Sequence, residues 1–450
     1  MIALDALAAN VRGLVIQPGS EPYDQRRRTF NAMIDRRPVV IVVPLDTADV
    51  VAAVRWAGEQ DLPISIRGGG HSVAGHSVGD GSLMLDLCEL RSVAMDPRAR
   101  TADVGGGALL EDLDRATTGH GLAAPSGTFY DTGVAGLTLT GGLSFLLGTA
   151  GFACDALIGA ELVAADGVVT DVNAETDPEL LWALRGGGGN FGVVTRLRFS
   201  LIPLSGVYGG SISYAPEETA AVLHRLFEVR ERAADELTLQ AFLSRKDGKG
   251  DVTIHLLAAW TGDPDDGPAV FRPFRVGLAV DEDDVRPRTY LELQAMNGRM
   301  GPTYRHYWKG QFVGEASPGL EDAILGSAAA ATSAGGLLVE AIHGMAHRIP
   351  ESHAAFGARA AIANVSALAI WEDPADDDRH IGWARATTDA LAPYALRGGA
   401  GYLNYAPPDE SATRVARAFG AERFVRLQSV KRRCDPDNRF RFNANIPPTD

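Results

Sequence analysis

A glycine-rich segment at residues 67–81, RGGGHSVAGHSVGDG, cannot form a packed helix or strand. Apolar runs of strand character flank it at residues 62–66 and 83–87, so the sequence predicts a loop held between two strands. Glycines permit positive φ angles and let backbone N–H groups approach an anion, as in the nests that cradle pyrophosphates. The segment therefore indicates a nucleotide-binding loop, with an ordinary long turn as the alternative.

The same loop carries two histidines, His71 and His76. An imidazole is the side chain best suited to act as a neutral nucleophile near pH 7. The alternative is that both rings are solvated on a turn. The loop alone does not decide between these interpretations.

Two further glycine-bearing segments follow. Residues 125–142 (PSGTFYDTGVAGLTLTGG) contain too many glycines for a regular helix, so a ligand cradle competes with an ordinary loop. Four glycines at 186–189 precede a predicted strand at 193–201. A Rossmann fingerprint needs a strand, then glycines, then a helix. The order found here argues against a Rossmann site.

The chain length of 450 residues favours two domains. In the first half, a helix capped by Asp46 or Thr47 is expected between two strands, and Asp166 with Gly167 predicts a hairpin turn. From about residue 204 the pattern becomes helix followed by strands, typical of a separate antiparallel α+β domain. Within it, the aromatic cluster YRHYWKGQF at 304–312 favours packing over a binding site.

The charge balance excludes one class of partner. With 42 basic and 57 acidic residues, the net charge of −15 repels phosphate backbones, so nucleic acid is not expected. The three cysteines are too widely spaced for a disulfide framework or a zinc site, and no metal is expected. The N-terminus lacks the pattern of a secretory signal and no apolar run reaches the length of a membrane span, which indicates a cytoplasmic protein without a membrane partner.

Five motifs together resemble the berberine-bridge-enzyme-like FAD-linked oxidases of the vanillyl-alcohol-oxidase (PCMH) superfamily. The motifs are RGGGHSVAGHS, GVAGLTLTGG, LRGGGGNFGVVT, YLNY and VKRRCDPDNRFRFNANIP, and the resemblance runs from about residue 36 to 448. It implies an α+β, two-domain PCMH-type fold whose substrate domain is an antiparallel sheet. The expected limits are 1–205 for the FAD domain, 206–400 for the substrate domain and 401–450 for a C-terminal segment that returns to the FAD domain.

The resemblance implies FAD bound covalently through His71, which matches the family's flavin-linked histidine. Where doubly tethered members place a second, cysteine link, this chain has Phe129, and Cys154 lies too far along to replace it. A single covalent bond is implied, with His76 in a hydrogen-bonding role. The implied cofactor-binding residues are Arg67, Gly68, Gly69, Gly70, His71, Ser72, Gly75, His76, Gly127, Thr132, Gly133, Gly136, Thr138, Gly141, Gly192, Val194, Tyr402, Asn404 and Asn443.

Flavin oxidation of an alcohol or amine also needs a base for the O–H or N–H proton. Tyr402 matches a tyrosine that the family uses near the flavin, but a tyrosine is a poor base unless a neighbouring cation lowers its pKa. Lys309 and His306 are candidates for that cation. Tyr402 could instead only pack or orient the substrate.

Three further residues complete the catalytic candidates. Glu340 and His343 lie on one expected strand with side chains on opposite faces, so at most one of them should reach the site. Thr132 matches the position that gates oxygen beside the flavin in this family.

The favoured function is a FAD-dependent oxidase that passes a hydride from an alcohol or amine to FAD and then to O2, releasing H2O2. The first alternative is a flavin monooxygenase or oxidative cyclase of natural-product biosynthesis. The second is a non-redox nucleotide-binding protein. The expected partners are a small-molecule substrate and O2, and a homodimer is allowed.

Overall fold

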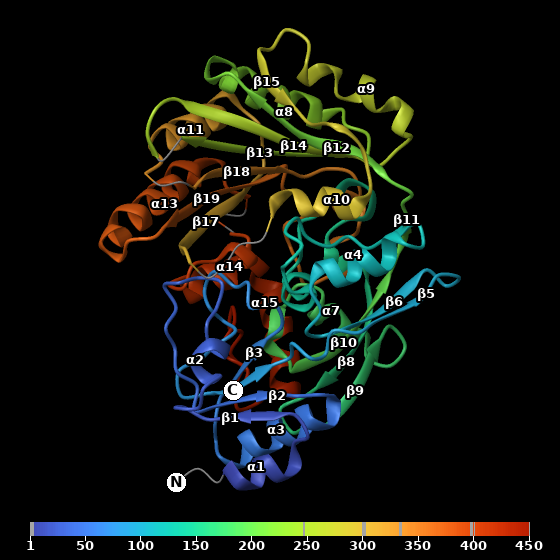
Figure 1. Cartoon of the computed structure of the whole chain (residues 1–450), viewed down its shortest axis with the longest axis vertical. Helices are drawn as coiled ribbons and strands as arrows, with labels where there is room; N and C mark the ends of the chain where they lie inside the picture. Colours follow the sequence, from blue (N-terminus) through green and yellow to red (C-terminus); the bar gives the residue numbers. More distant parts are fainter. Residues whose placement is uncertain are drawn as a thin grey trace.

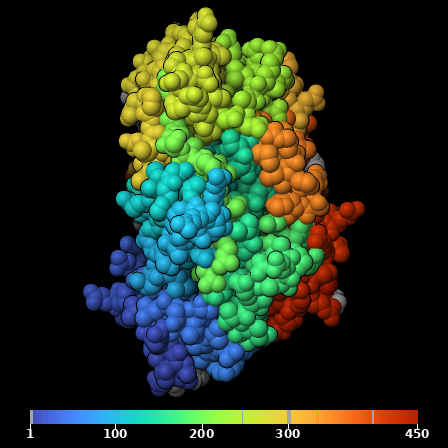
Figure 2. All heavy atoms as spheres, turned by 90° about the vertical axis from the view of Figure 1, so that its right-hand side faces the viewer, coloured from blue at the N-terminus to red at the C-terminus, as the bar shows by residue number. Residues whose placement is uncertain are grey.

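The computed structural model describes residues 4–245, 248–298, 303–332, 335–396, 399 and 401–449. Two parts are stacked along the long axis: the N-terminal half with the C-terminal helices forms the lower part, and the central segment forms the upper part (Figure 1). Seen from the side, the green and yellow central segment caps the blue and teal N-terminal half (Figure 2). The combination of helices with largely antiparallel sheets confirms the predicted α+β class. The domain limits at residues 205 and 400 remain predictions.

The first sheet has four strands in the order β1-β2-β4-β3. They are β1 (Leu14–Ile16), β2 (Val40–Val43), β3 (Ile64–Arg67) and β4 (Leu83–Asp86), and the associated helices are α1 (Leu4–Asn10), α2 (Tyr23–Arg26) and α3 (Thr47–Glu59). β2 and β3 both pair in parallel with β4. The side chain of Asp46 accepts a hydrogen bond from the Asp49 N–H and caps α3, as predicted. The glycine-rich segment is confirmed as the connection from β3 to β4.

The second sheet has five antiparallel strands in the order β5-β6-β10-β8-β9. They are β5 (Val93–Asp96), β6 (Thr101–Gly105), β8 (Leu157–Val163), β9 (Val169–Asn173) and β10 (Val193–Ser200). The predicted hairpin joins β8 to β9, with Gly167 at φ 76° and the Asp166 side chain accepting from the Val168 N–H. The other elements of this part of the chain are α4 (Leu110–Thr118), α6 (Leu147–Ala150), α7 (Pro178–Leu184) and a separate pair of short strands, β7 (Leu122–Ala123) and β11 (Ile202–Pro203).

The segment at 125–142 is not wholly a loop. A short helix, α5 (Val134–Leu139), lies inside it, so the expectation that its glycines exclude a regular helix was wrong for these six residues. The single glycine within α5, Gly136, is tolerated because Val134, Ala135 and Leu139 are buried in the core beside it. The helix ends at Leu139 with Thr140 as its C-cap, before two glycines with positive φ.

The central segment folds into one large antiparallel sheet, in the order β15-β12-β14-β13-β18-β19-β17 with β16 paired to β12. Its strands are β12 (Val207–Tyr214), β13 (Leu237–Arg245), β14 (Val252–Trp260), β15 (Val280–Asp283), β16 (Arg286–Arg288), β17 (Arg305–Val313), β18 (Gly336–Ala341) and β19 (Ala363–Trp371). The helices of this part are α8 (Thr219–Glu231), α9 (Gly267–Val270), α10 (Tyr290–Gln294), α11 (Pro318–Ala329), α12 (Met345–Arg348) and α13 (Asp377–Leu391). The aromatic cluster at 304–312 is therefore largely one strand, β17.

The two faces of this sheet differ. One face buries aliphatic residues such as Leu239, Val339 and Val365 against α8, α11 and α13, and forms the main core of the upper part. The opposite face of the sheet is turned toward the lower part. Two contacts show this: Trp308 lines the pocket described below, and the Thr238 hydroxyl donates to the Phe145 carbonyl at 2.8 Å. Alternation along the strands therefore places a distinct set of side chains above the lower part.

The C-terminal segment returns to the lower part through α14 (Ala412–Phe419) and α15 (Ala421–Cys434). Lys431 on α15 is fully buried, where its ammonium donates to Asp435 Oδ2 at 2.6 Å and to the carbonyls of Asn190 and Phe440. Because all of its N–H donors have partners, the buried charge is compensated. This contact fastens the tail to the residues that follow the glycine run at 186–189.

A buried polar cluster links the two parts. Asp114 on α4 accepts a hydrogen bond from the Ser126 hydroxyl, and Gln294 on α10 donates to Ser126 Oγ and to the Gly127 carbonyl. Burial raises the pKa of Asp114 to about 8. The folded protein therefore keeps a proton at neutral pH that the unfolded chain, with an aspartate pKa of about 4, releases.

Replacing Asp114 with asparagine should stabilise the protein increasingly as the pH rises. Wild-type folding retains the Asp114 proton, so its free energy of unfolding should fall between pH about 4 and about 8. The asparagine of Asp114→Asn does not titrate, so the variant lacks this pH dependence. Its free energy of unfolding should exceed that of the wild type by roughly 2–5 kcal/mol at pH 9 and differ little near pH 4. Denaturant unfolding at both pH values measures this, and a pH-independent difference would contradict it.

Within the described residues, no helix is both long and apolar enough to cross a membrane. The same residues contain no group of three or more His, Cys, Asp or Glu side chains that could hold a metal ion.

Candidate functional site

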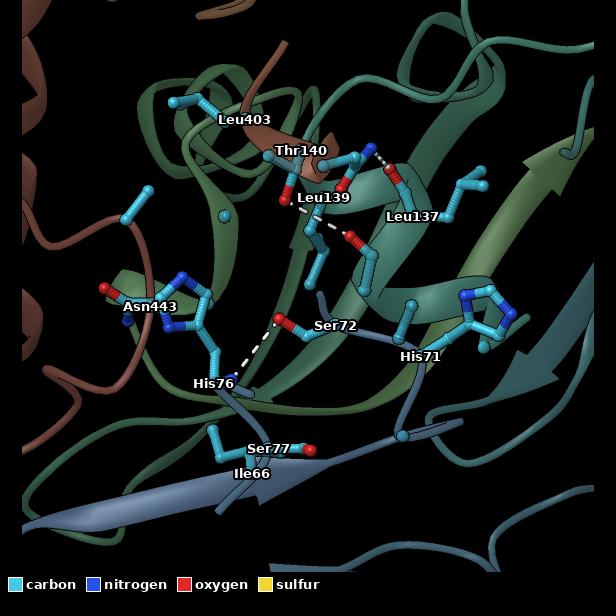
Figure 3. A pocket seen from close by; sticks show the side chains of 18 of the residues that line it. Ile66, His71, Ser72, His76, Ser77, Leu137, Leu139, Thr140, Leu403 and Asn443 are labelled. Carbon is cyan, nitrogen blue, oxygen red and sulfur yellow. Dashed lines mark hydrogen bonds between the residues drawn. The ribbon is translucent and has the colours of Figure 1, made fainter. Parts of the chain in front are cut away.

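The main cavity lies in the lower part, where four segments distant in sequence meet under the large sheet. These are the β3–β4 loop, the segment around α5, the glycine run at 186–189 and the C-terminal tail. In Figure 3, His76 lies beside Asn443 of the tail, whereas His71 projects on the other side of Ser72. The residues of the predicted cofactor set that line this pocket are Gly68, Gly69, Gly70, His71, Ser72, His76, Thr132, Gly133, Gly136, Gly192, Val194, Tyr402, Asn404 and Asn443.

Two of the glycine segments are in direct backbone contact. A Cβ added to Gly69 would lie 2.4 Å from the Gly133 nitrogen, and a Cβ on Gly133 would lie 2.3 Å from the Gly69 nitrogen. No side chain fits at either position, so both must be glycine for the two loops to meet. This contact fixes the position of the β3–β4 loop against the start of α5.

The pocket has the properties that a dinucleotide such as FAD requires. A Cβ on Gly136 or Gly189, which both line the cavity, would meet no atom within 4 Å, so the backbone there borders open space. None of the described lining residues is Lys or Arg. The donors available to a pyrophosphate are therefore the backbone N–H groups of the glycine segments, together with hydroxyl and amide side chains such as Ser72 and Asn443. The aromatic and aliphatic wall, including Trp308 and Leu143, suits a flat ring system.

The environment of His71 keeps its ring neutral. The ring stacks on Phe30, with ring centroids 4.1 Å apart, and its Nε2 lies 3.7 Å from Asp131 Oδ1. Burial lowers the pKa of His71, while the Asp131 charge acts in the opposite direction. A neutral imidazole in this position has the lone pair that a nucleophile needs.

His76 is also neutral. Burial, reinforced by the nearby Arg36 charge, lowers the pKa of His76 to about 4. Its backbone N–H donates to the Ser72 hydroxyl at 3.3 Å (Figure 3). Its ring lines the cavity and is therefore accessible to a bound cofactor.

Tyr402 lies in the wall of the cavity, and its hydroxyl oxygen is surrounded by hydrogen-bond donors. That oxygen accepts from the backbone N–H groups of Gly142 and Leu143, at 3.1 and 3.0 Å, and from Asn404 Nδ2 at 2.8 Å. Burial nevertheless raises the pKa of Tyr402. The hydroxyl therefore stays protonated at neutral pH, which suits an orienting role.

The expectation that a cation lowers the pKa of Tyr402 was wrong. Lys309 forms an ion pair with Glu410, with Nζ 3.1 Å from Oε2. His306 stacks on the other face of Phe30 at 4.1 Å, and burial lowers its pKa to about 3, so it carries no charge. Neither side chain lines the cavity.

Glu340 is the buried acid beside the cavity. It is 1% exposed, and it accepts from Asn364 Nδ2 at 2.7 Å and from the Tyr405 hydroxyl at 3.2 Å. Burial raises its pKa to about 7, although both hydrogen bonds favour the ionised form. Tyr405 lines the cavity, so it connects the carboxyl group to the pocket wall.

His343 does not share this position. It follows β18, and its Nε2 lies 2.6 Å from the Leu237 carbonyl oxygen, within the packing between β13 and α6. The structure therefore places only Glu340 of this pair next to the cavity wall, in agreement with the expectation that at most one would reach it.

Five residues of the predicted cofactor set lie around the cavity without lining it: Arg67, Gly75, Gly127, Thr138 and Gly141. Arg67 donates to the carbonyls of Arg26 and Arg28 and so supports the loop from behind. A Cβ on Gly75 would contact Ile34 at 2.6 Å, and one on Gly141 would contact Phe356 at 2.7 Å. These residues shape the segments that carry the lining.

Phe129 lines the cavity 6.2 Å from the His71 ring, and Cys154 does not line it. Cys154 is buried in a 3-10 turn at Ala153–Ala156, and burial raises its thiol pKa. A buried, protonated thiol is a poor nucleophile.

Sequence reasoning missed several lining residues. Tyr405 is the second tyrosine of the YLNY motif, and the glycines at 186–189 belong to the LRGGGGNFGVVT motif, but neither was assigned to the cofactor-binding set. Phe442 belongs to the C-terminal motif. For these three, the motif itself was the available signal. Trp308 lies in the aromatic cluster at 304–312. There, the alternation of side chains along a strand could have shown which residues share one face of the sheet.

The fold and the cavity define a class of two-part proteins with a deep pocket between the glycine loops and the C-terminal tail. A family model described as an FAD binding domain matches residues 38–173, and one described as berberine and berberine like matches residues 401–447. The (R)-6-hydroxynicotine oxidase of Paenarthrobacter nicotinovorans is 32% identical over 98% of both chains. An FAD-linked oxidoreductase of Dictyostelium discoideum is 27% identical over 98% of this chain and 95% of its own.

Solved structures agree with this class. The crystal structure of 6-hydroxy-D-nicotine oxidase from Arthrobacter nicotinovorans matches with a TM-score of 0.89 at 30% identity, over 98% of both chains. Berberine bridge enzyme from Eschscholzia californica shares the fold, with a TM-score of 0.89 at 21% identity over 99% of both chains. The chain belongs to the berberine-bridge-enzyme-like family of FAD-linked oxidoreductases. It is an FAD-dependent enzyme, which sets aside the non-redox nucleotide-binding alternative.

Proposed function

We propose that the protein is an oxidase that removes a hydride from an alcohol or amine carbon, using FAD bound covalently through His71, and that O2 then takes the electrons and forms H2O2. The observation that carries this proposal is the buried Glu340 carboxyl joined to Tyr405 in the wall of the FAD pocket. FAD, when bound, accepts the hydride and passes electrons to O2. The protein must supply the cofactor cradle, the orientation of the substrate and a proton acceptor.

The glycine loops and the tail would hold the cofactor. The Gly69–Gly133 contact rigidly positions His71, and Lys431 fastens the tail that contributes Asn443. His71 is neutral and lines the cavity, so it meets the chemical requirements of a covalent tether.

Glu340 is proposed as the proton acceptor. A carboxyl group whose pKa lies near 7 is ionised in about half of the molecules at neutral pH and is matched to general-base catalysis at that pH. Tyr405 can carry the proton from the substrate to Glu340 through its hydrogen bond, because it borders both the cavity and the carboxylate. Tyr402, held by three donors, would orient the substrate or the ring system instead.

An anaerobic substrate screen tests the function. The purified protein is mixed without oxygen with alcohols, sugars, amines and hydroxylated N-heterocycles, and loss of the flavin absorption band reports hydride transfer. Hydroxylated pyridines are among the first compounds to test, because one relative is named as a 6-hydroxynicotine oxidase. The proposal predicts bleaching by at least one alcohol or amine class, and bleaching only by a nicotinamide cofactor would contradict it.

Thr132 is proposed to admit oxygen, because it lines the cavity and is smaller than leucine. Replacing it with leucine should slow reoxidation of the reduced enzyme by O2, because the larger side chain would fill the approach to the flavin. Reduction by substrate should change little. Stopped-flow mixing of the reduced enzyme with O2 measures this, with Thr132→Ser as the matched control. Equal reoxidation rates in the leucine variant would count against the assignment.

A further inference from the structure

The side chain of Asp131 lies beside the ring of His71. Nε2 of His71 is buried and has no hydrogen-bond partner among the described residues, and Asp131 Oδ1 is 3.7 Å away. The two side chains are 13% and 14% exposed. Water therefore screens their interaction only partly, and the carboxylate acts on the imidazole at short range.

The backbone imposes this pairing. Gly69 and Gly133 touch with no room for a side chain, and His71 and Asp131 each lie two residues from that contact. Thr132, between Asp131 and Gly133, closes a turn by donating its N–H to the Phe129 carbonyl at 3.0 Å. The separation of carboxylate and imidazole is therefore set by the meeting of the two loops, not by a flexible surface contact.

The aromatic side chains around the His71 ring, among the described residues, carry no charge. Phe30 covers one face at 4.1 Å, and Phe129 is tilted toward the ring at 6.2 Å. His306 lies behind Phe30 and is neutral, because burial lowers its pKa to about 3. Among these neighbours, Asp131 is the one that can accept a proton from His71.

We propose that Asp131 positions His71 for flavin attachment and accepts the imidazole proton as the covalent bond forms. This inference rests on the proposed covalent attachment. In the step, a bond forms between an imidazole nitrogen and the 8-methyl carbon of the flavin, and one methyl C–H bond breaks. One proton leaves the methyl carbon, and one leaves the imidazole for Asp131. The electron pair of the broken C–H bond stays on the flavin ring system and passes to O2, which takes up two protons and becomes H2O2.

Asp131→Asn separates charge from shape, because asparagine has nearly the same size but cannot accept the proton. The flavin-free protein is mixed with FAD in air, and intact mass spectrometry follows the covalent fraction with time. We expect attachment to slow about 10²-fold in Asp131→Asn, the lower end of what a positioned base contributes, while FAD is still bound without a covalent bond. Asp131→Glu should recover part of the rate, and formate should accelerate Asp131→Ala.

The neighbouring variant Tyr130→Phe is the matched control and should attach FAD at the wild-type rate, because Tyr130 does not line the pocket. Wild-type attachment rates in Asp131→Asn would overturn the inference. So would equal loss of attachment in the Asn and Glu variants without rescue of the Ala variant by formate, because that pattern indicates a purely structural role. If acid releases the flavin from the wild type, the covalent proposal itself fails, which is a different outcome.

Discussion

Wild-type protein should keep its flavin through acid precipitation, and His71→Ala should release it completely. His71 is the nucleophile that we propose for attachment, and Cys154, the other residue considered for a link, is buried away from the cavity. Intact mass should show the wild type heavier by one FAD and His71→Ala at the mass of its bare chain. The effect is close to all or none because a covalent bond is either present or absent.

His76→Ala is the matched control, because it removes the other histidine of the same loop. Its ring lines the cavity and its pKa is lowered to about 4, so it is also neutral, but Ser72 separates it from His71 (Figure 3). The flavin that His76→Ala binds should stay attached to the protein through acid precipitation. Acid-stable flavin in His71→Ala, or its loss only in His76→Ala, would move the attachment site.

Glu340→Gln should slow flavin reduction by about 10²–10⁴-fold, the range expected for a positioned general base. In the wild type the reduction rate should rise with pH through about 7, because the carboxyl group must lose its proton before it can accept one from the substrate. The amide of the variant cannot ionise, so this pH dependence should disappear. Anaerobic stopped-flow reduction between pH 5 and 9, with a substrate from the screen, measures both effects.

Tyr402→Phe separates the two base assignments. It keeps the ring but removes the hydroxyl that accepts from Gly142, Leu143 and Asn404. With Glu340 as the base, this variant keeps the rise in rate near pH 7. If Tyr402→Phe loses that rise while Glu340→Gln retains it, the proton acceptor is Tyr402, as the sequence first suggested.

Much of the local structure could be predicted because it depends on short-range chemistry. Asp46 caps α3, Asp166 with Gly167 turns the β8–β9 hairpin, and the glycines of the β3–β4 loop form no regular element, all as expected. The residue types at these positions have few alternative conformations. Of the 19 residues that the family resemblance implied for cofactor binding, 14 line the main pocket.

The remaining features depend on packing between distant segments. Tyr402 seemed the best base from its motif, but its burial and its three donors became apparent only when α5 and the tail were brought together. Glu340 gained its partner Tyr405 from 65 residues further along the chain. The contact of Asp131 with His71 depends on two glycines that meet across loops, and no local pattern encodes that meeting.

Single-turnover reoxidation tests the central claim most directly. The enzyme is reduced anaerobically by one equivalent of its substrate and then mixed with O2, while flavin absorbance and peroxide are followed together. An oxidase predicts full return of the flavin band and one H2O2 per flavin, with the substrate recovered as its two-electron oxidation product. Reoxidation without peroxide, with an oxygen atom found in the product, would identify a monooxygenase and contradict the account.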